Sequence, residues 1–244
     1  MLAMENPIQQ ATQKIKNAQH PVSFSGAGLS AESGIATFRD KKDEDALWSK
    51  FDPMQLASQE GFASDPAMVI DWYNYRRKTL AAAQPNDAHR VLAGLSGWTH
   101  ITQNVDHLLE SAGADGEGVL HLHGTLLADH CNANCGHTES VNLEHALPLR
   151  KCQCGHYMRP SVVWFGESLP ERTMQMALTE TQKTDLMLVV GTSAQVYPAA
   201  GLIDIAKSNG ADVIVVNTES SGVAEDGVIE LVGPAGEILP ALFE

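Results

Sequence analysis

PVSFSGAGLSA (residues 21–31) decides the fold, because a short apolar run leads directly into two glycines one residue apart. Residues 21–25 are typical of a buried strand. Residues 26–31 match the pattern G-x-G-x-x-A, in which small residues let the start of a helix approach a phosphate group. A tight turn without a ligand can have the same pattern. The stretch therefore predicts a strand–turn–helix unit and leaves its ligand open.

Outside this stretch, more apolar runs bounded by turn residues predict further strands. They occur at residues 100–102, 119–122, 162–165, 186–190 and 213–216. Several are too continuous in Val, Leu and Ile to be half-exposed, and helical patterns alternate with them at residues 8–18, 88–95 and 199–207. Such alternation predicts an α/β fold with a parallel sheet covered on both faces.

Two segments interrupt the α/β pattern. Residues 124–158 are rich in Cys, His, Asn and Gly and contain no strand of the parallel kind, so we interpret them as an insertion. Residues 37–61 are dense in charge and turn residues, and a helix is expected after them at residues 68–83. This second interruption predicts a lid or a small helical module.

Composition limits the possible functions and locations. The 244 residues include 16 Lys and Arg against 30 Asp and Glu, which gives a net charge of −14. This acidic balance argues against nucleic acid held by bulk electrostatics, since phosphate neutralisation needs a basic face. No run approaches the roughly 18 apolar residues of a membrane span, and the first 20 residues lack the features of a targeting signal. We expect an unprocessed soluble protein of the cytoplasm with no membrane partner.

The four cysteines are Cys131, Cys135, Cys152 and Cys154, all within one short segment. Such clustering favours a local metal site in a reducing compartment, with zinc the expected ion. Two disulfides or four unrelated thiols are the alternatives. Neighbouring histidines at 130, 137 and 156 could replace one thiolate, since zinc accepts mixed ligands.

Polar residues follow several of the predicted strands, at the edge where open α/β sheets bind ligands. The segments are Gln103–Asp106, Gly191–Ser193 and Asn217–Glu219, in addition to Gly26–Ser30. Each could also be a turn or a helix cap. His121-Leu122-His123-Gly124 ends another predicted strand, and an accessible histidine there suits a general base, although an uninvolved histidine would have the same pattern.

Taken together, the motifs GAGLSAESGIATFRD, TQNVDHL, HLHG, four cysteines, RPSVVWFGE, GTS and VVNTE resemble the sirtuin family of NAD-dependent protein lysine deacylases. The resemblance runs from about Val22 to Pro240. It implies a Rossmann-like domain (1–36, 84–123 and 159–244) and a small domain made of a helical lid module (37–83) and a zinc-binding module (124–158). It also implies an acyl-lysine peptide as substrate.

The resemblance assigns roles residue by residue. His123 would be the general base, and Asn104 would also act in catalysis. The residues expected to contact NAD are Gly26, Ala27, Gly28, Ser30, Thr37, Phe38, Arg39, Gln103, Asn104, Val105, Asp106, Gly191, Thr192, Ser193, Asn217, Thr218, Glu219 and Ala235. The residues expected to contact the substrate peptide are Val163, Trp164, Phe165, Gly166 and Glu167.

In the chemistry that the resemblance implies, the acyl oxygen attacks the nicotinamide ribose and nicotinamide leaves. His123 then promotes attack by a ribose hydroxyl, which yields O-acyl-ADP-ribose and free lysine. Two departures from the family pattern stand out. The second cysteine pair, Cys152-x-Cys154, is unusually close, and an acidic run at residues 41–45 replaces a glycine-rich stretch.

Tyr73 and Arg76 are three residues apart and so share a helical face. With the small residue Ala57, they resemble the sirtuin subgroup that removes succinyl, malonyl and related acidic acyl groups. A guanidinium suits a carboxylate at the acyl terminus, whereas a solvated helix face is the plain alternative. Deacetylation alone, mono-ADP-ribosyl transfer and an inert zinc-ribbon interaction module are the competing functions, and the sequence leaves the oligomeric state open.

Overall fold

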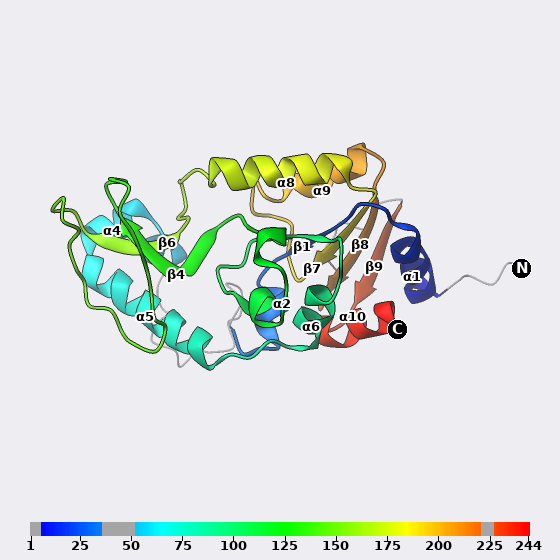
Figure 1. The fold of residues 1–244 in the computed structure, drawn as a ribbon, viewed down its shortest axis with the longest axis horizontal. Coiled ribbons are helices and arrows are strands. Elements are labelled where there is room, and N and C mark those ends of the chain that lie inside the picture. The colour runs from blue at the N-terminus through cyan, green and yellow to red at the C-terminus, as the bar shows by residue number, and fades with distance from the viewer. Residues whose placement is uncertain (1–5, 36–51, 221–226) are drawn as a thin grey trace, which may run out of the picture. The chain divides into compact units, whose positions relative to one another are not determined.

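The computed structural model describes residues 6–35, 52–220 and 227–244, and these form two compact units (Figure 1). The sheet unit comprises the described parts of residues 1–37, 84–122 and 171–244. The cysteine unit comprises those of residues 38–83 and 123–170. Residues 159–170, expected in the Rossmann-like domain, belong to the cysteine unit instead. His123 is the first residue of this unit's second segment.

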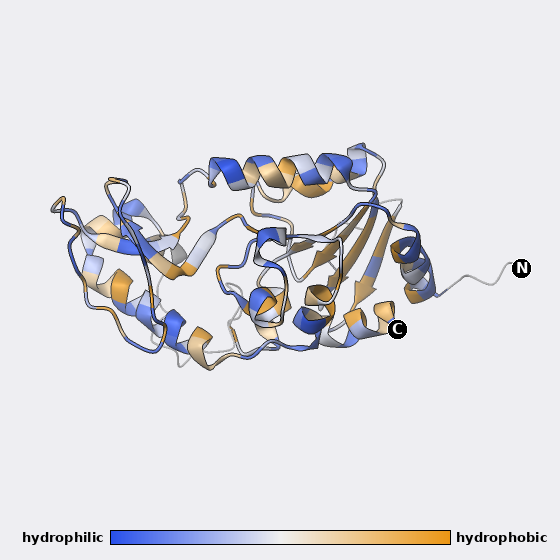
Figure 2. Ribbon diagram, in the orientation of Figure 1, coloured by the Kyte–Doolittle hydropathy of each residue, from blue (hydrophilic) through white to orange (hydrophobic). Residues whose placement is uncertain are grey.

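The sheet unit contains a six-stranded parallel sheet in the order β3-β2-β1-β7-β8-β9. The strands are β1 (Pro21–Ser25), β2 (Thr99–Thr102), β3 (Val119–His121), β7 (Leu186–Val190), β8 (Asp212–Asn217) and β9 (Val228–Val232). All five residues of β7 are buried, which explains its unbroken apolar sequence. Hydropathy colouring shows this apolar centre of the unit (Figure 2). The predicted parallel α/β fold is confirmed.

Helices cover the sheet. They are α1 (Pro7–Asn17), α2 (Gly28–Ala31), α6 (Asp87–Ala93), α7 (Leu108–Ser111), α8 (Glu171–Lys183), α9 (Gly201–Ser208) and α10 (Ala235–Phe243), with a 3-10 turn η2 at Gly116–Gly118. Leu188 and Val190 of β7 pack in one core with Leu29, Leu92 and Leu239 from three helices. The intervening residue Val189 points to the opposite face, because strand side chains alternate. Helix α9 packs against β7 and β8.

The cysteine unit contains a three-stranded antiparallel sheet in the order β5-β4-β6. Its strands are β4 (Gly124–Cys131), β5 (Thr138–Ser140) and β6 (Met158–Val162), and its helices are α3 (Pro53–Leu56), α4 (Gln59–Ser64) and α5 (Pro66–Ala82). Helix α5 begins where the Asp65 side chain accepts a hydrogen bond from the backbone N–H of Met68, 3.0 Å away. The predicted helix at residues 68–83 is therefore present.

The strand predictions contain one error and one omission. The run 162–165, expected as a parallel strand, is not one: β6 ends at Val162 and pairs antiparallel with β4. Periodicity does not distinguish the two kinds of strand in a short apolar run. Strand β9 was not predicted, since Glu230 interrupts its apolar sequence. No helix in the described residues is long and apolar enough to cross a membrane.

Candidate functional site

The loops after β1 and β7 touch through their backbones. The N–H of Gly28 donates a 2.8 Å hydrogen bond to the carbonyl of Gly191. A Cβ added at Gly28 would lie 2.6 Å from Cα of Gly191, and Gly191 itself has a φ of +60°. Both positions therefore require glycine. The close approach places the start of α2 against the loop after β7, at the sheet edge where open α/β folds bind ligands.

Polar side chains link three strand ends in the sheet unit. Gln103 follows β2, and its amide donates to the hydroxyl of Thr192 after β7, 3.2 Å away. Asn217 at the end of β8 donates to the carbonyl of the same Thr192, also at 3.2 Å. The structure thus brings together three of the predicted cofactor-binding residues, from positions far apart in the sequence.

Ser30 is the centre of a second, buried polar group. Its hydroxyl donates to the Asp106 carboxylate at 2.9 Å and accepts from the Asn104 side-chain amide at 3.0 Å. His89 Nε2 lies 3.4 Å from the same hydroxyl, and burial lowers the pKa of His89 to about 4, against the opposing charge of Asp106. A neutral His89 can donate to Ser30 while its Nδ1 accepts from Asn86. The network fixes the rotamers of Asn104 and Asp106.

The remaining predicted NAD-contacting residues are less tightly held. Ala27 and Ser193 are half-buried in the strand-end loops, Val105 is buried, and Thr218 and Glu219 are exposed after β8. Ala235 is buried at the first position of α10. Thr37, Phe38 and Arg39 lie outside the described residues.

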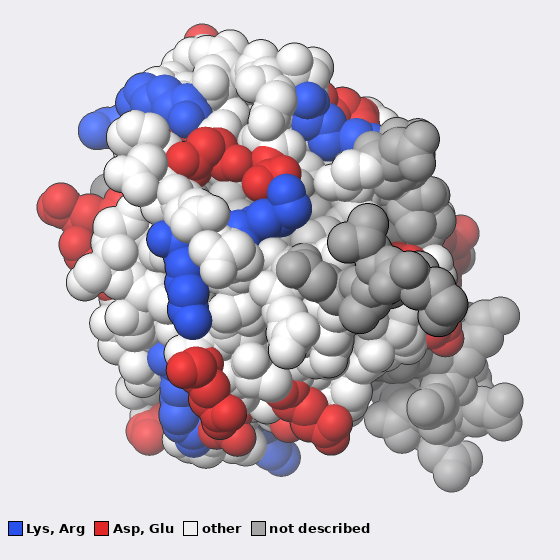
Figure 3. All heavy atoms as spheres, turned by 90° about the vertical axis from the view of Figure 1, so that its right-hand side faces the viewer, with Lys and Arg blue, Asp and Glu red and all other residues white. Residues whose placement is uncertain are grey.

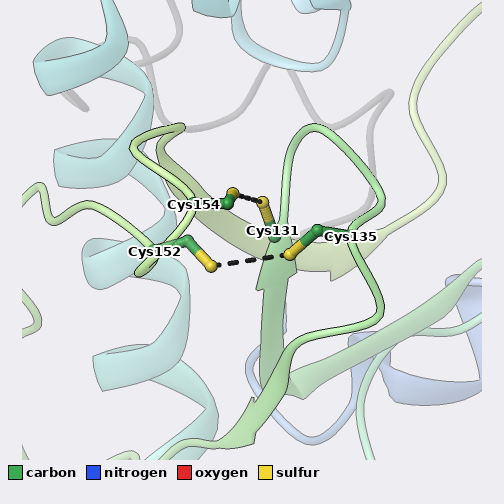
Figure 4. Close-up of side chains that lie close together, drawn as sticks. All are labelled: Cys131, Cys135, Cys152 and Cys154. Atoms are coloured by element: carbon green, nitrogen blue, oxygen red, sulfur yellow. Dashed lines mark hydrogen bonds between the residues drawn. The ribbon is translucent and has the colours of Figure 1, made fainter.

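The four cysteines converge in the cysteine unit (Figure 4). All four sulfur atoms lie within 4.8 Å of one another, with Cys131–Cys154 at 3.3 Å and Cys135–Cys152 at 3.6 Å. A tetrahedral zinc with Zn–S bonds of about 2.3 Å places its sulfurs about 3.8 Å apart. The cysteines are free thiols and form no disulfide. Their arrangement fits one structural zinc ion, so the close Cys152-x-Cys154 spacing is compatible with metal binding.

Each cysteine pair lies on a tight turn. Asn134 N–H donates to the carbonyl of Cys131 at 2.8 Å, and Gly155 N–H donates to that of Cys152 at 2.9 Å. Burial would raise the pKa of the Cys131 thiol, but hydrogen bonds from the Ala133 backbone and from neighbouring thiols outweigh it and lower that pKa to about 6. A thiolate is the form that binds metal.

The neighbouring histidines are not needed as ligands. His137 pairs with Glu139 at 2.7 Å, and Nδ1 of His130 lies 3.2 Å from the Ser161 hydroxyl. His156 lies 3.7 Å from the Cys154 sulfur but outside the four-sulfur group. The cysteines alone supply four ligands.

The predicted substrate segment, residues 163–167, follows β6 and turns at Gly166, whose φ is +84°; we call it the strap. Val163 N–H donates to the carbonyl of His123, and Phe165 N–H donates to that of Ala57, both at 2.9 Å. Trp164 is buried, whereas the Phe165 side chain is 46% exposed. Glu167 accepts from the Trp164 backbone and pairs with Arg159, so it braces the segment from within.

Tyr73 and Arg76 lie together on α5, as their spacing predicts. The Arg76 guanidinium lies 4.9 Å from the ring centroid of Trp72 and 5.8 Å from that of Tyr73. The Tyr73 hydroxyl is fully buried and accepts a 2.7 Å hydrogen bond from the Trp164 indole. This contact joins the predicted acyl-recognition residues to the predicted substrate segment.

Sequence reasoning missed a buried ion pair in this unit. Arg77 of α5 pairs with Asp129 of β4, and both side chains are almost inaccessible to water. Arg77 also donates to the Leu126 carbonyl at 3.0 Å, and Arg150 pairs with the other oxygen of Asp129 at 2.7 Å. The pair fastens α5 to the cysteine-bearing sheet. A lone arginine in a helix gives no signal that it is buried.

Comparison with known proteins identifies the family. The family model described as Sir2 family matches residues 26–198. This chain belongs to the Sir2 family. Within that family it is 44% identical over 233 residues to an NAD-dependent protein deacylase of Mycobacterium leprae, covering 91% of this chain and 96% of the relative. It is 45% identical over 242 residues to NAD-dependent protein deacylase 1 of Pseudomonas aeruginosa, covering 94% and 95%.

Solved structures of Sir2 proteins have the same fold. A Sir2 homologue in complex with NAD superposes with a TM-score of 0.88 at 38% identity, covering 98% of this chain and 93% of that one. A Sir2 protein bound to a myristoylated histone peptide gives a TM-score of 0.77 at 34% identity, covering 98% and 95%. The sirtuin resemblance stated from sequence is therefore confirmed.

Proposed function

We propose that this Sir2-family chain is an NAD-dependent protein lysine deacylase. The observation that carries the proposal is the set of polar strand ends around Gly28, Gly191 and Ser30, in a chain whose curated relatives are named for this activity. NAD is a co-substrate in this reaction and supplies a ribose carbon that accepts the acyl oxygen as nicotinamide leaves. The four-cysteine site would hold zinc as a structural ion.

The residues of the sheet unit would bind and orient NAD. The backbone at Gly28 and Gly191 suits the phosphates, because glycine adds no side-chain bulk where these two loops meet at the strand ends. The fixed amide of Asn104 and carboxylate of Asp106 suit ribose hydroxyls, since both can accept hydrogen bonds. Orientation by a prearranged network reduces the entropy that the reaction must lose.

His123 would act as the general base. It is half-buried, lies next to the strap through its backbone carbonyl, and is followed by Gly124, whose φ is +78°. An imidazole titrates near neutral pH and can take a proton from a ribose hydroxyl. We assign NAD binding to the sheet unit and peptide binding to the cysteine unit.

The test is nicotinamide release measured with purified protein, NAD and an acyl-lysine peptide. We expect release that needs both NAD and the acylated peptide, and none with the same peptide carrying free lysine. Nicotinamide release that does not depend on the acylated peptide would contradict deacylation.

We further propose a preference for acidic acyl groups, succinyl or malonyl, over acetyl. The position of the Arg76 guanidinium, 4.9 Å from the ring centroid of Trp72 and 5.8 Å from that of Tyr73, supports this, because cation–π attraction keeps its charge beside Tyr73. Ala57 is small and buried beside the strap, and its carbonyl accepts from Phe165. A longer acyl chain would need the room that a small residue leaves.

A panel of acetyl, succinyl, malonyl and glutaryl peptides tests this preference in Arg76→Met. The loss of a hydrogen bond to a charged group, about 1.5 to 3 kcal/mol, predicts a roughly ten- to hundredfold fall in kcat/KM for succinyl peptide. Deacetylation should be spared. Lys78→Met, an exposed change on the same helix, is the matched control. Equal loss of all activities would make Arg76 structural, and unchanged desuccinylation would place it away from the acyl group.

For partners, we propose acyl-lysine proteins, with no nucleic acid or membrane partner, in the cytoplasm. A solved relative was bound to a myristoylated histone peptide, and another to a p53 peptide with NAD. On the face of the described residues seen in Figure 3, acidic and basic side chains alternate without a continuous basic field. This mixture and the net charge of −14 favour peptide over nucleic acid.

A further inference from the structure

Three titratable side chains cluster in the sheet unit beside the Asn104 loop. His121 is the last residue of β3, Glu110 lies on α7, and His107 immediately precedes α7. His121 Nε2 is 2.7 Å from Glu110 Oε1, and His107 Nε2 is 3.9 Å from the same oxygen. The two imidazole rings are stacked, with centroids 4.7 Å apart and planes 16° from parallel. The proposed chemistry uses none of the three.

Both ring nitrogens of His121 face hydrogen-bond acceptors. Nδ1 lies 2.8 Å from the backbone carbonyl of Asn104, and Nε2 lies 2.7 Å from the Glu110 carboxylate. Neutral imidazole carries only one N–H, so it can satisfy only one of these acceptors. The geometry therefore requires a second proton on the ring, and the ionised Glu110 carboxylate is placed to stabilise the resulting charge.

The surrounding charges agree with this protonation. Burial alone would lower the pKa of His121, but its hydrogen bonds to Glu110 and Asn104, with the charges of Glu110 and Asp106, raise that pKa above its ordinary value. His107 stacks on the His121 ring, and burial lowers the pKa of His107. The nearby His89, whose pKa is about 4, is neutral. One positive charge therefore faces the carboxylates.

A metal ion is a poorer occupant of this cluster than a proton. Zinc binds imidazole nitrogen about 2.0 to 2.1 Å away along the lone pair, which lies in the ring plane. Stacked rings direct their lone pairs along nearly parallel planes, so those of His107 and His121 do not converge on one ion. The cluster has the geometry of a charged hydrogen bond.

We propose that His121, as a doubly hydrogen-bonded imidazolium, is a positioning residue that holds the backbone of Asn104 for NAD binding. Asn104 is fixed at three points: its N–H donates to the Thr102 hydroxyl at 3.1 Å, its amide donates to Ser30, and its carbonyl accepts from His121. His121 supplies the only one of these contacts that needs a titratable proton. The inference rests on the proposed function, because it takes Asn104 as an NAD contact.

Loss of the second proton would remove the Asn104 contact. As pH rises through the raised pKa, the remaining proton favours the ionised Glu110, since hydrogen bonds to charged groups are the stronger ones. Nδ1 then turns a lone pair toward the Asn104 carbonyl. The contact is present below the ordinary histidine pKa and is lost as pH rises through the folded-state pKa. Loss of one hydrogen bond predicts a roughly three- to tenfold rise in KM for NAD.

Two variants separate this role from a merely structural one. His121→Phe keeps an aromatic ring at this position and removes both N–H donors, so its KM for NAD should be raised at every pH. Glu110→Gln has the shape of the original residue and offers an amide N–H to an unprotonated Nε2. The single proton of His121 then stays on Nδ1, which donates it to the Asn104 carbonyl. The KM of this variant should stay low at high pH, where the wild-type value rises. His20→Phe, at an exposed histidine, is the control.

The experiment combines nitrogen-15 NMR of histidine-labelled, NAD-free protein with steady-state kinetics from pH 6 to 9. We expect both His121 nitrogens to be protonated at pH 6, and the wild-type KM for NAD to approach that of His121→Phe as the ring titrates. A single-proton His121 tautomer at pH 6 would overturn the inference, as would parallel KM profiles for wild type and Glu110→Gln. Equal broadening of the His107 and His121 signals by one equivalent of Ni²⁺ would show that the cluster binds a metal ion, which would overturn the inference. If the wild-type protein released no nicotinamide in response to acyl peptide, the proposed function would be contradicted. The NMR result would then still decide whether His121 carries two protons.

Discussion

The sheet unit and the cysteine unit hold their functional residues by different means. In the sheet unit a large apolar core carries the strands, and the site is built at their ends from close backbone approach, as at Gly28 and Gly191. In the cysteine unit a three-stranded sheet is fastened by four sulfurs and by the buried pair of Arg77 and Asp129. The first unit therefore depends on packing, and the second depends on ligands and paired charges.

Removing the metal should produce the largest difference in stability between the two units. Structural zinc contributes apparent binding energies of ~10 to 16 kcal/mol in zinc-finger peptides, so Cys135→Ser should lose zinc and unfold the cysteine unit at a lower temperature. The sheet unit should keep its hydrogen-exchange protection. His137→Gln, at a half-buried residue two positions away, is the control and should retain one zinc. Metal analysis that finds no zinc in active wild-type protein would remove the basis of the comparison.

Replacing the proposed base should separate chemistry from NAD binding. His123→Ala is expected to lose ~10² to 10⁴-fold in turnover, the usual contribution of a general base. Its dissociation constant for NAD, measured by calorimetry, should stay near the wild-type value because the contacts of the sheet unit are unchanged. His20→Ala is the control. Wild-type turnover in His123→Ala would reject the assignment.

The buried ion pair offers a matched test within the cysteine unit. Arg77→Met leaves Asp129 without its most buried partner, so we expect a loss of about 3 to 5 kcal/mol in unfolding free energy. Arg150→Met removes the partly exposed partner of the same carboxylate and should cost about 0 to 1 kcal/mol. Denaturant titration measures both. Equal costs would show that burial does not decide the contribution of the pair.

Glycine substitution should have the smallest effect of the series, and it acts on the sheet unit. Gly28→Ala places a methyl group 2.6 Å from Cα of Gly191, so overpacking should cost about 1 to 3 kcal/mol and weaken NAD binding. Gly116→Ala meets nothing within 4 Å and should change stability by less than about 0.5 kcal/mol. Thermal melts and NAD titration measure both variants. An unaltered NAD affinity in Gly28→Ala would show that this loop does not contact the cofactor.

Sequence was most informative where local pattern and tertiary structure agree. The run 186–190 became β7 without change, since every one of its residues is buried. The polar strand ends were also predictable, because parallel strands place their carboxyl ends at one edge. The run 162–165 misled, since Val162 ends the antiparallel strand β6 and residues 163–165 lie after it.

Long-range polar pairs were the least predictable part of the site. Arg77 and Asp129 are 52 positions apart, and neither residue type signals burial. His121 was visible beside His123, but its two acceptors come from Glu110 and Asn104, which only the folded chain brings near. Helical spacing did predict that Tyr73 and Arg76 share a face; what Arg76 contacts in a substrate stays a prediction.

The most direct test of the account is the mass and amount of the products formed from NAD and succinyl-lysine peptide. Deacylation predicts one O-succinyl-ADP-ribose and one free-lysine peptide for each nicotinamide released. Nicotinamide released with ADP-ribose attached to protein or peptide, and with the succinyl group retained, would contradict the account and indicate mono-ADP-ribosyl transfer.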